Sequence, residues 1–163
     1  MKVILFPLLA ALVMLSCSKR KELRTENQPD PTISVFEFGS KYGFCIGNKC
    51  YTSFSLSDEG LKKTTSSAIG TNKETISISD SLKIKTVMKV LAEMPLTIRQ
   101  LKKDTVYGCP DCYDQGGIFV TIIRNETTPD TTQILFDNSI ESNPKELQPY
   151  VLALAKALVK LNE

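Results

Sequence analysis

Five cysteines are the residues of this sequence whose type and spacing could most directly do chemistry. They fall into three groups: Cys17 near the start, Cys45 and Cys50 with four residues between them, and the Cys-x-x-Cys pair Cys109 and Cys112 in VYGCPDCYDQGG. Thiols at such spacings serve as redox centres, metal ligands or disulfide bonds. Which use applies depends on the compartment in which the chain folds.

The N-terminal sequence predicts export. Lys2 is followed by an apolar run over residues 3–15, about half the length that a membrane-spanning helix needs, which is typical of a secretory signal peptide. MLSC then resembles the lipobox of bacterial lipoproteins, although Met14 stands where leucine is more usual. That resemblance implies cleavage before Cys17 and attachment of acyl chains, including palmitate, to this cysteine. The alternative is a plain secretory signal with an incidental cysteine.

The remaining chain divides into a tether and one domain. Residues 1–16 are the predicted signal peptide, residues 17–32 the lipidated cysteine and a flexible, polar tether, and residues 33–163 a single globular domain. Without Lys2 and the tether, basic and acidic residues are equal in number, so we expect no nucleic-acid partner. The expected partner is a membrane, reached through the lipid on Cys17.

The composition excludes several kinds of catalysis. The sequence contains no histidine, which removes Ser-His-Asp and Cys-His catalysis and every histidine metal ligand. The acidic residues Asp104, Asp111 and Asp114 lack the dense spacing of calcium loops, and Asp111 and Asp114 lie in a turn where solvation is the usual state. We therefore predict no catalytic residue, no metal and no cofactor.

Hydrophobic periodicity predicts an α+β fold, with an antiparallel sheet of four to five strands and two amphipathic helices packed on one face. Alternation on both sides of Gly47-Asn48 indicates a first hairpin, and the apolar run over residues 118–123 indicates a central, covered strand. Residues 61–75 are predicted to be an exposed edge strand and loop.

Both helices carry end signals. The first is expected to begin after Asp80 as its N-cap and to stop at Pro95. Its buried face is predicted to be Ile84, Val87, Met88, Leu91 and Met94. The second helix is expected to have Asn143 as its N-cap and Pro144 at its first position, with Pro149 delaying or kinking the start.

In an exported chain the four cysteines after Cys17 favour disulfides, because an oxidising compartment forms and keeps them. We favour the local pairs Cys45–Cys50 and Cys109–Cys112, while crossed pairs closing loops of about 60 residues remain open. A redox site is the first alternative, but the Cys-x-x-Cys pair leads toward a strand and not a helix. Four thiolates around zinc are the second alternative.

The stretch CIGNKCYTSFSLSDEG resembles a small cysteine-hairpin domain of unknown function found in lipoproteins of Bacteroidota-type bacteria. The resemblance spans residues 34–161 and includes a closing Pro-x-x-Leu helix, here Pro144 and Leu147. Tyr51 departs from the pattern, which commonly has proline after the second cysteine. Because the family has no known activity, the resemblance implies no catalytic residue.

The sequence therefore predicts a non-catalytic binding module anchored in the cell envelope, with an unknown protein or small-molecule ligand there as its partner. The candidate contacts lie in the two cysteine loops, over residues 43–49 and 107–117. They are Tyr107, Asp111, Tyr113 and Asp114, together with Phe44 and with Tyr42, which directly precedes the first loop. Alternatively, the aromatic residues of this set pack as hydrophobic side chains beneath the loops. The basic residues after Cys17 favour the periplasmic side of the outer membrane. The alternative function is a redox or zinc protein using Cys109 and Cys112.

Overall fold

A computed structural model of the chain describes residues 32–43, 45, 49–67, 72–110, 112, 116–125 and 130–163. The strands are β1 (Ile33–Lys41), β2 (Tyr51–Ser57), β3 (Gly60–Ser66), β4 (Lys73–Ile78), β5 (Thr105–Tyr107), β6 (Gly117–Arg124) and β7 (Asp130–Asp137). The helices are α1 (Ser81–Ala92), α2 (Leu96–Arg99) and α3 (Gln148–Asn162), with a short 3-10 helix η1 (Ile140–Ser142) before α3.

The strands form one mixed sheet in the order β4-β3-β2-β1-β6-β7-β5. All neighbouring strands are antiparallel except β5, which runs parallel to β7. The predicted α+β class is confirmed, but the sheet has seven strands where four to five were expected. The two additional strands are β4 and β5. Strand β4 lies at the exposed edge of the sheet and alternates polar with apolar residues, and β5 has only three residues.

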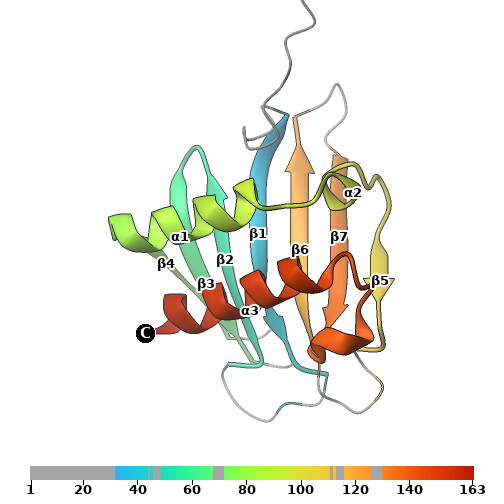
Figure 1. Cartoon of the computed structure of the whole chain (residues 1–163). Helices are drawn as coiled ribbons and strands as arrows, with labels where there is room; N and C mark the ends of the chain where they lie inside the picture. Colours follow the sequence, from blue (N-terminus) through green and yellow to red (C-terminus); the bar gives the residue numbers. More distant parts are fainter. Residues whose placement is uncertain are drawn as a thin grey trace, which may run out of the picture.

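Helices α1 and α3 lie together across one face of the sheet (Figure 1), and no described helix lies on the other face. Side chains from five strands and these helices form the core between them, among them Phe36, Phe38, Phe54, Val120, Ile134, Val87 and Leu154. Every residue of β6 except Ile123 is buried. The predicted central strand is thus confirmed, since β6 has β1 on one side and β7 on the other.

Helix α1 begins where the sequence predicted. The Asp80 carboxylate accepts hydrogen bonds from the backbone N–H groups of Leu82 (2.7 Å) and Lys83 (3.3 Å), as an N-cap does. The predicted buried face needs one correction, because Met88 is 50% exposed and Val90 is buried in its place. The helix is therefore rotated slightly about its axis relative to the expected face.

Helix α3 begins at Gln148, later than the predicted start after Asn143. Pro149 lies in its first turn, so the expected delay is confirmed, but Asn143 as N-cap is wrong. The buried Asn143 side chain bonds the preceding turn instead. Its amide donates to the carbonyl oxygens of Asp137 (3.0 Å) and Ser139 (2.9 Å), and its oxygen accepts from the Asp137 N–H (3.1 Å).

A buried arginine joins the sheet to α2. The guanidinium of Arg124, at the end of β6, donates to Asp130 and Thr132 of β7 at 3.1 Å each. Its second terminal nitrogen, Nη2, donates to the carbonyl oxygens of Arg99 (2.7 Å) and Leu101 (2.9 Å). Arg124 is 2% exposed, so these bonds replace the water that its charge would otherwise need.

Candidate functional site

The two cysteine loops meet at one end of the sheet. Lys41, the last residue of β1, is paired with Tyr51 at the start of β2 and with Gly117 at the start of β6. The loop before β2 contains Cys45 and Cys50, and the loop before β6 contains Cys109 and Cys112. We call this end, with the described residues 42, 43, 45, 49, 50, 108–110, 112 and 116, the stapled end. Ile33, which follows the predicted tether, lies at the opposite end of β1.

Both local disulfides are present. The Cα atoms of Cys45 and Cys50 are 5.5 Å apart and those of Cys109 and Cys112 are 5.3 Å apart, and each pair is bonded. The crossed pairings are therefore wrong for this structure. The Cys50 carbonyl also accepts a hydrogen bond from Tyr42 N–H at 3.0 Å, so the first disulfide lies directly on the β1–β2 hairpin.

The Cys109–Cys112 turn is fixed to the neighbouring strand. The Asp137 carboxylate, at the end of β7, accepts from Cys109 N–H (2.9 Å) through one oxygen and from Ser139 N–H (2.8 Å) through the other. Gly108 has a φ of +72°, and a Cβ there would lie 2.6 Å from the Asp137 Cβ, so glycine is needed. After this turn the chain enters β6, a strand, as predicted.

The predicted binding residues divide into described and undescribed ones. Tyr107 lies in β5 with its ring stacked on Phe136, the centroids 5.6 Å apart, and it packs against the core. Tyr107 therefore fills space beneath the loop, which was the alternative interpretation of these aromatic residues. Asp111, Tyr113, Asp114, Phe44 and Cys17, the predicted site of lipidation, lie outside the described residues. Tyr42 is 48% exposed.

A groove of about 460 Å³ adjoins the stapled end. Its lining combines the ends of β1 and β6 with the last two turns of α3, namely Ser40, Tyr42, Ile118, Asn138, Ala155, Leu158, Val159, Asn162 and Glu163. Val159 is 65% exposed, so this groove presents an apolar helix face beside the exposed ring of Tyr42. The sequence did not predict the groove, because it depends on how α3 crosses the sheet.

The face of the sheet opposite the helices carries an aromatic pair. The rings of Tyr51 and Phe119 stack with centroids 5.0 Å apart, and Gly39 of β1 lies between their strands. The Tyr51 hydroxyl donates to the Glu37 carboxylate at 2.9 Å. Burial raises the pKa of Tyr51 well above its ordinary value, a hydrogen bond with Ser53 lowers it, and the Glu37 charge raises it further.

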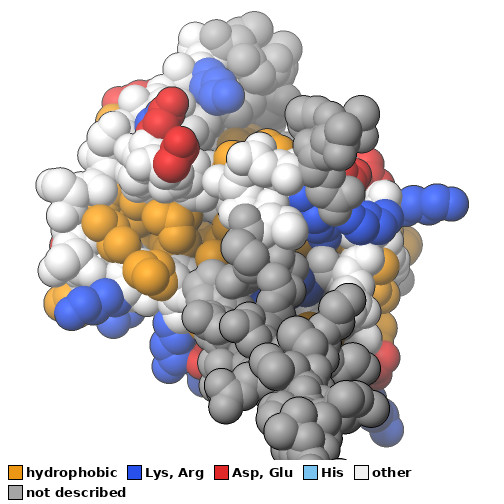
Figure 2. Space-filling view, turned by 90° about the horizontal axis from the view of Figure 1, so that it is seen from above, with side chains coloured by type: hydrophobic (Ala, Val, Ile, Leu, Met, Phe, Trp, Pro, Cys, Tyr) orange, Lys and Arg blue, Asp and Glu red, His pale blue; other side chains and the backbone are white. Residues whose placement is uncertain are grey.

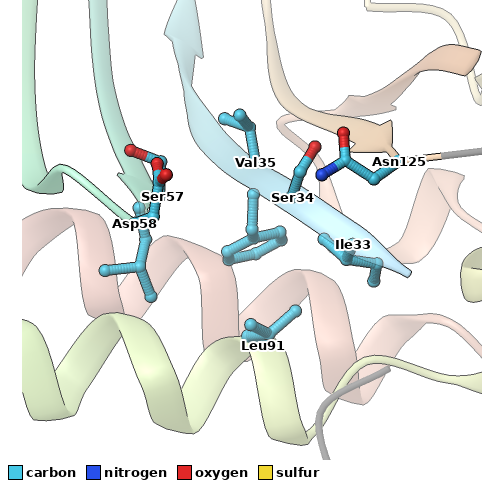
Figure 3. Close-up of a pocket in the computed structure, with 9 residues that line it drawn as sticks. Ile33, Ser34, Val35, Ser57, Asp58, Leu91 and Asn125 are labelled. Carbon is cyan, nitrogen blue, oxygen red and sulfur yellow. The ribbon is translucent and has the colours of Figure 1, made fainter. Parts of the chain in front are cut away.

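A second hollow, of about 490 Å³, lies at the end of the sheet where β1 begins (Figure 3). We call it the tether-end pocket. It is lined by Ile33, Ser34, Val35, Phe36, Leu56, Ser57, Asp58, Leu91 and Asn125. Figure 2 views this end and shows hydrophobic side chains gathered in a patch with acidic side chains beside it. No sequence signal had marked this pocket.

Within the described part of the chain, no group of three or more cysteine, aspartate, glutamate or histidine side chains is arranged to hold a metal ion. Likewise, none of the described helices is long and apolar enough to cross a membrane.

No family model, curated protein or solved structure matches the chain. The lipobox and the cysteine-hairpin resemblance therefore remain predictions from the sequence.

Proposed function

We propose that this protein is an exported, lipid-anchored, non-catalytic binding module of the cell envelope, and that its stapled end is the binding surface. The observation that carries this proposal is the placement of the two ends of β1. The predicted tether joins the domain at Ile33, whereas Lys41 leads into the stapled end. Nine strand residues separate the two ends by about 30 Å.

This separation supports a binding role for the stapled end. A domain anchored through the residues before Ile33 would hold the stapled end away from the bilayer, where a partner in the envelope can reach it. Two disulfides restrict the loops there, so a partner meets a surface whose conformational entropy has already been reduced. The exposed Tyr42 ring and the apolar groove beside it offer contact area of the kind that binding surfaces use.

The redox and zinc alternatives have less support. Cys109 and Cys112 are bonded to one another, and the turn that holds them continues into β6, so the described residues supply no helix N-terminus to lower a thiol pKa. A titration of free thiols in the exported protein distinguishes structural disulfides from a redox centre. A stapled protein yields no free thiol under mild reductant, while a redox protein releases two at Cys109 and Cys112.

The anchoring is tested by labelling cells that express the full chain with radioactive palmitate. We expect label on the parent protein and none on Cys17→Ser, since serine offers no sulfur for the diacylglyceryl group. Cys45→Ser with Cys50→Ser is the matched control, because it removes other cysteines and should keep the label. Equal labelling of the parent and Cys17→Ser would refute the anchor.

The binding surface is tested by placing a photo-crosslinking amino acid at Tyr42 or at Met88 in cells. Both side chains are about half exposed, but Met88 lies on α1, away from the stapled end. We expect a discrete cross-linked product from position 42 alone. Products of the same size from both positions, or none from position 42, would contradict the proposed surface.

A further inference from the structure

The tether-end pocket owes its apolar floor to an irregularity in β1. Ile33 is paired with Arg124 and Val35 with Ile123, so Ser34 is an extra residue in β1, and its hydroxyl donates to the Ile123 carbonyl at 3.1 Å. Such a bulge redirects the neighbouring side chains. As a result Ile33 lies on the side of β1 that faces α1, whereas Val35 lies on the other side (Figure 3).

The apolar floor of the pocket joins the hydrophobic core, but most of its side chains remain partly exposed. Phe36 is 1% exposed and closes the bottom of the pocket, while Ile33, Leu56 and Leu91 are only partly buried although they pack against the core. These three side chains come from β1, β2 and α1 and converge on one hollow. Its volume of about 490 Å³ is within the range of ligand pockets, roughly 300–1,000 Å³.

The rim is polar and carries one kind of charge. Ser57 and Asp58 stand on the side of the β2–β3 turn, and Asn125 stands on the side of β6 (Figure 3). Among the lining residues Asp58 alone has an acidic or basic side chain. An apolar floor beneath hydrogen-bonding groups and a carboxylate suits a molecule with an apolar chain and an uncharged or cationic head, and disfavours an anionic head.

The residues before β1 are poorly suited to fill this hollow themselves. Residues 18–32 contain a single aliphatic side chain besides proline, Leu23, and are otherwise polar or charged. Filling an apolar pocket with such a segment would desolvate polar groups without gain. The occupant is thus better sought outside the chain.

We propose that the tether-end pocket binds the alkyl chain of a single-chain amphiphile whose head is neutral or cationic and lies at Ser57, Asp58 and Asn125. That such a molecule comes from the membrane rests on the proposed function, because the anchor would hold this end of the domain at the bilayer. The affinity for the amphiphile itself is a property of the pocket and does not depend on anchoring.

The test uses the full chain with Cys17→Ser, exported and purified, so that no acyl chain of its own competes. Methyl NMR signals of Ile33, Leu56 and Leu91 are followed while decyltrimethylammonium, octyl glucoside or decanoate is added below its micelle concentration. We expect saturable shifts with the first two, and binding of decanoate about threefold weaker than that of the cation because of Asp58.

Two variants and a control locate the site. Leu91→Gln should weaken binding of all three probes about tenfold, since the alkyl chain loses an apolar contact. Met88→Gln, one turn earlier on α1 and half exposed outside the lining, should leave binding unchanged. Asp58→Asn, on an exposed turn where folding is not at risk, should abolish the preference for the cation over decanoate.

Each other result overturns the proposal. Absence of saturable shifts with every probe does so, as does binding that Leu91→Gln and Met88→Gln weaken equally. Self-association that Leu91→Gln abolishes, without amphiphile binding, would assign the pocket to a second copy of the chain. Failure here leaves palmitate labelling of Cys17 unaffected, so it is distinguishable from failure of the proposed anchor.

Discussion

Tyr51 and Phe119 lie on strands that do not touch, yet their rings stack with centroids 5.0 Å apart across the backbone of β1. Gly39 is paired with Phe119 on one side and with Ser53 on the other, so the rings cover the one position of β1 that lacks a side chain. Phe119 is 1% exposed as a result. The glycine and the two rings therefore form one packing unit.

Replacing this glycine is expected to be severe. In Gly39→Ala the added Cβ would overlap the Thr52 carbonyl oxygen and lie 2.8 Å from the Ser53 Cα and 2.9 Å from the Phe119 ring. Since the backbone of β2 cannot move without disturbing the sheet, we expect a loss of about 3 kcal/mol in the free energy of unfolding, measured by urea denaturation.

Gly60→Ala is the matched control for that substitution. Gly60 has a φ of +100° but nothing within 4 Å of an added Cβ, so its cost is conformational and about 1–2 kcal/mol. If Gly39→Ala costs no more than Gly60→Ala, the close packing around Gly39 does not constrain the fold.

Alkaline pH should destabilise the protein through Tyr51. Its folded-state pKa is raised, mainly by burial, so the folded hydroxyl keeps its proton while the unfolded tyrosine ionises near pH 10. The stabilising contribution is therefore complete below pH 10 and is lost as the pH rises beyond it. We expect the free energy of unfolding to fall less steeply between pH 9 and about 11 in Tyr51→Phe than in the parent.

Tyr150 should also contribute to the loss of stability at alkaline pH. Its pKa is raised chiefly by complete burial in the first turn of α3, with Arg99 lowering it and Glu93 raising it. Tyr150→Phe should likewise flatten the alkaline loss of stability, and the effects of the two variants should add because the residues lie on opposite faces of the sheet. Identical pH profiles for the parent and both variants would contradict the raised pKa values.

The parts of the fold that could be predicted are those with a local signal. Helix α1 follows from the Asp80 cap, an apolar period of 3.6 and Pro95, and β6 follows from an apolar run. Strand β4 has a weaker signal, because Ile76 and Ile78 alternate with polar residues over only a few positions and almost all of its residues are exposed. Strand β5 is too short to show any period.

The candidate sites depend on tertiary placement to different degrees. The local disulfides were predictable because each pair is close in sequence. The tether-end pocket was not, since it requires the bulge at Ser34 and the approach of Leu91 from a distant helix. The role of Arg124 was also hidden, because an arginine at the end of an apolar strand has the pattern of a surface residue.

The buried Arg124 should be far more costly to replace than an exposed cation. Arg124→Met leaves the Asp130 carboxylate and the carbonyl oxygens of Arg99 and Leu101 without the bonds it donates. We expect a loss of about 3–5 kcal/mol in the free energy of unfolding. Lys62→Met, which removes an ion pair with the fully exposed Glu59, should change the free energy of unfolding very little. Similar losses in the two variants would show that the buried bonds contribute little.

The two disulfides should contribute to stability about equally. Each closes a short ring, with sequence separations of 5 and 3, for which the chain-entropy model gives about 2 kcal/mol. Replacing Cys45 and Cys50 by serine, or Cys109 and Cys112 by serine, should each lower the free energy of unfolding by that amount and leave a folded domain, as judged by circular dichroism and urea denaturation.

The same pair of variants distinguishes a staple from a functional thiol centre. If the disulfides only restrict the stapled end, both variants should weaken the cross-link formed from position 42, because each loosens a loop beside it. If Cys109 and Cys112 form a thiol centre, replacing these two cysteines should abolish the protein's function in cells, whereas replacing Cys45 and Cys50 should leave that function intact. Loss of cellular function in the Cys109 and Cys112 variant alone, with its free energy of unfolding unchanged, would contradict the binding-module proposal.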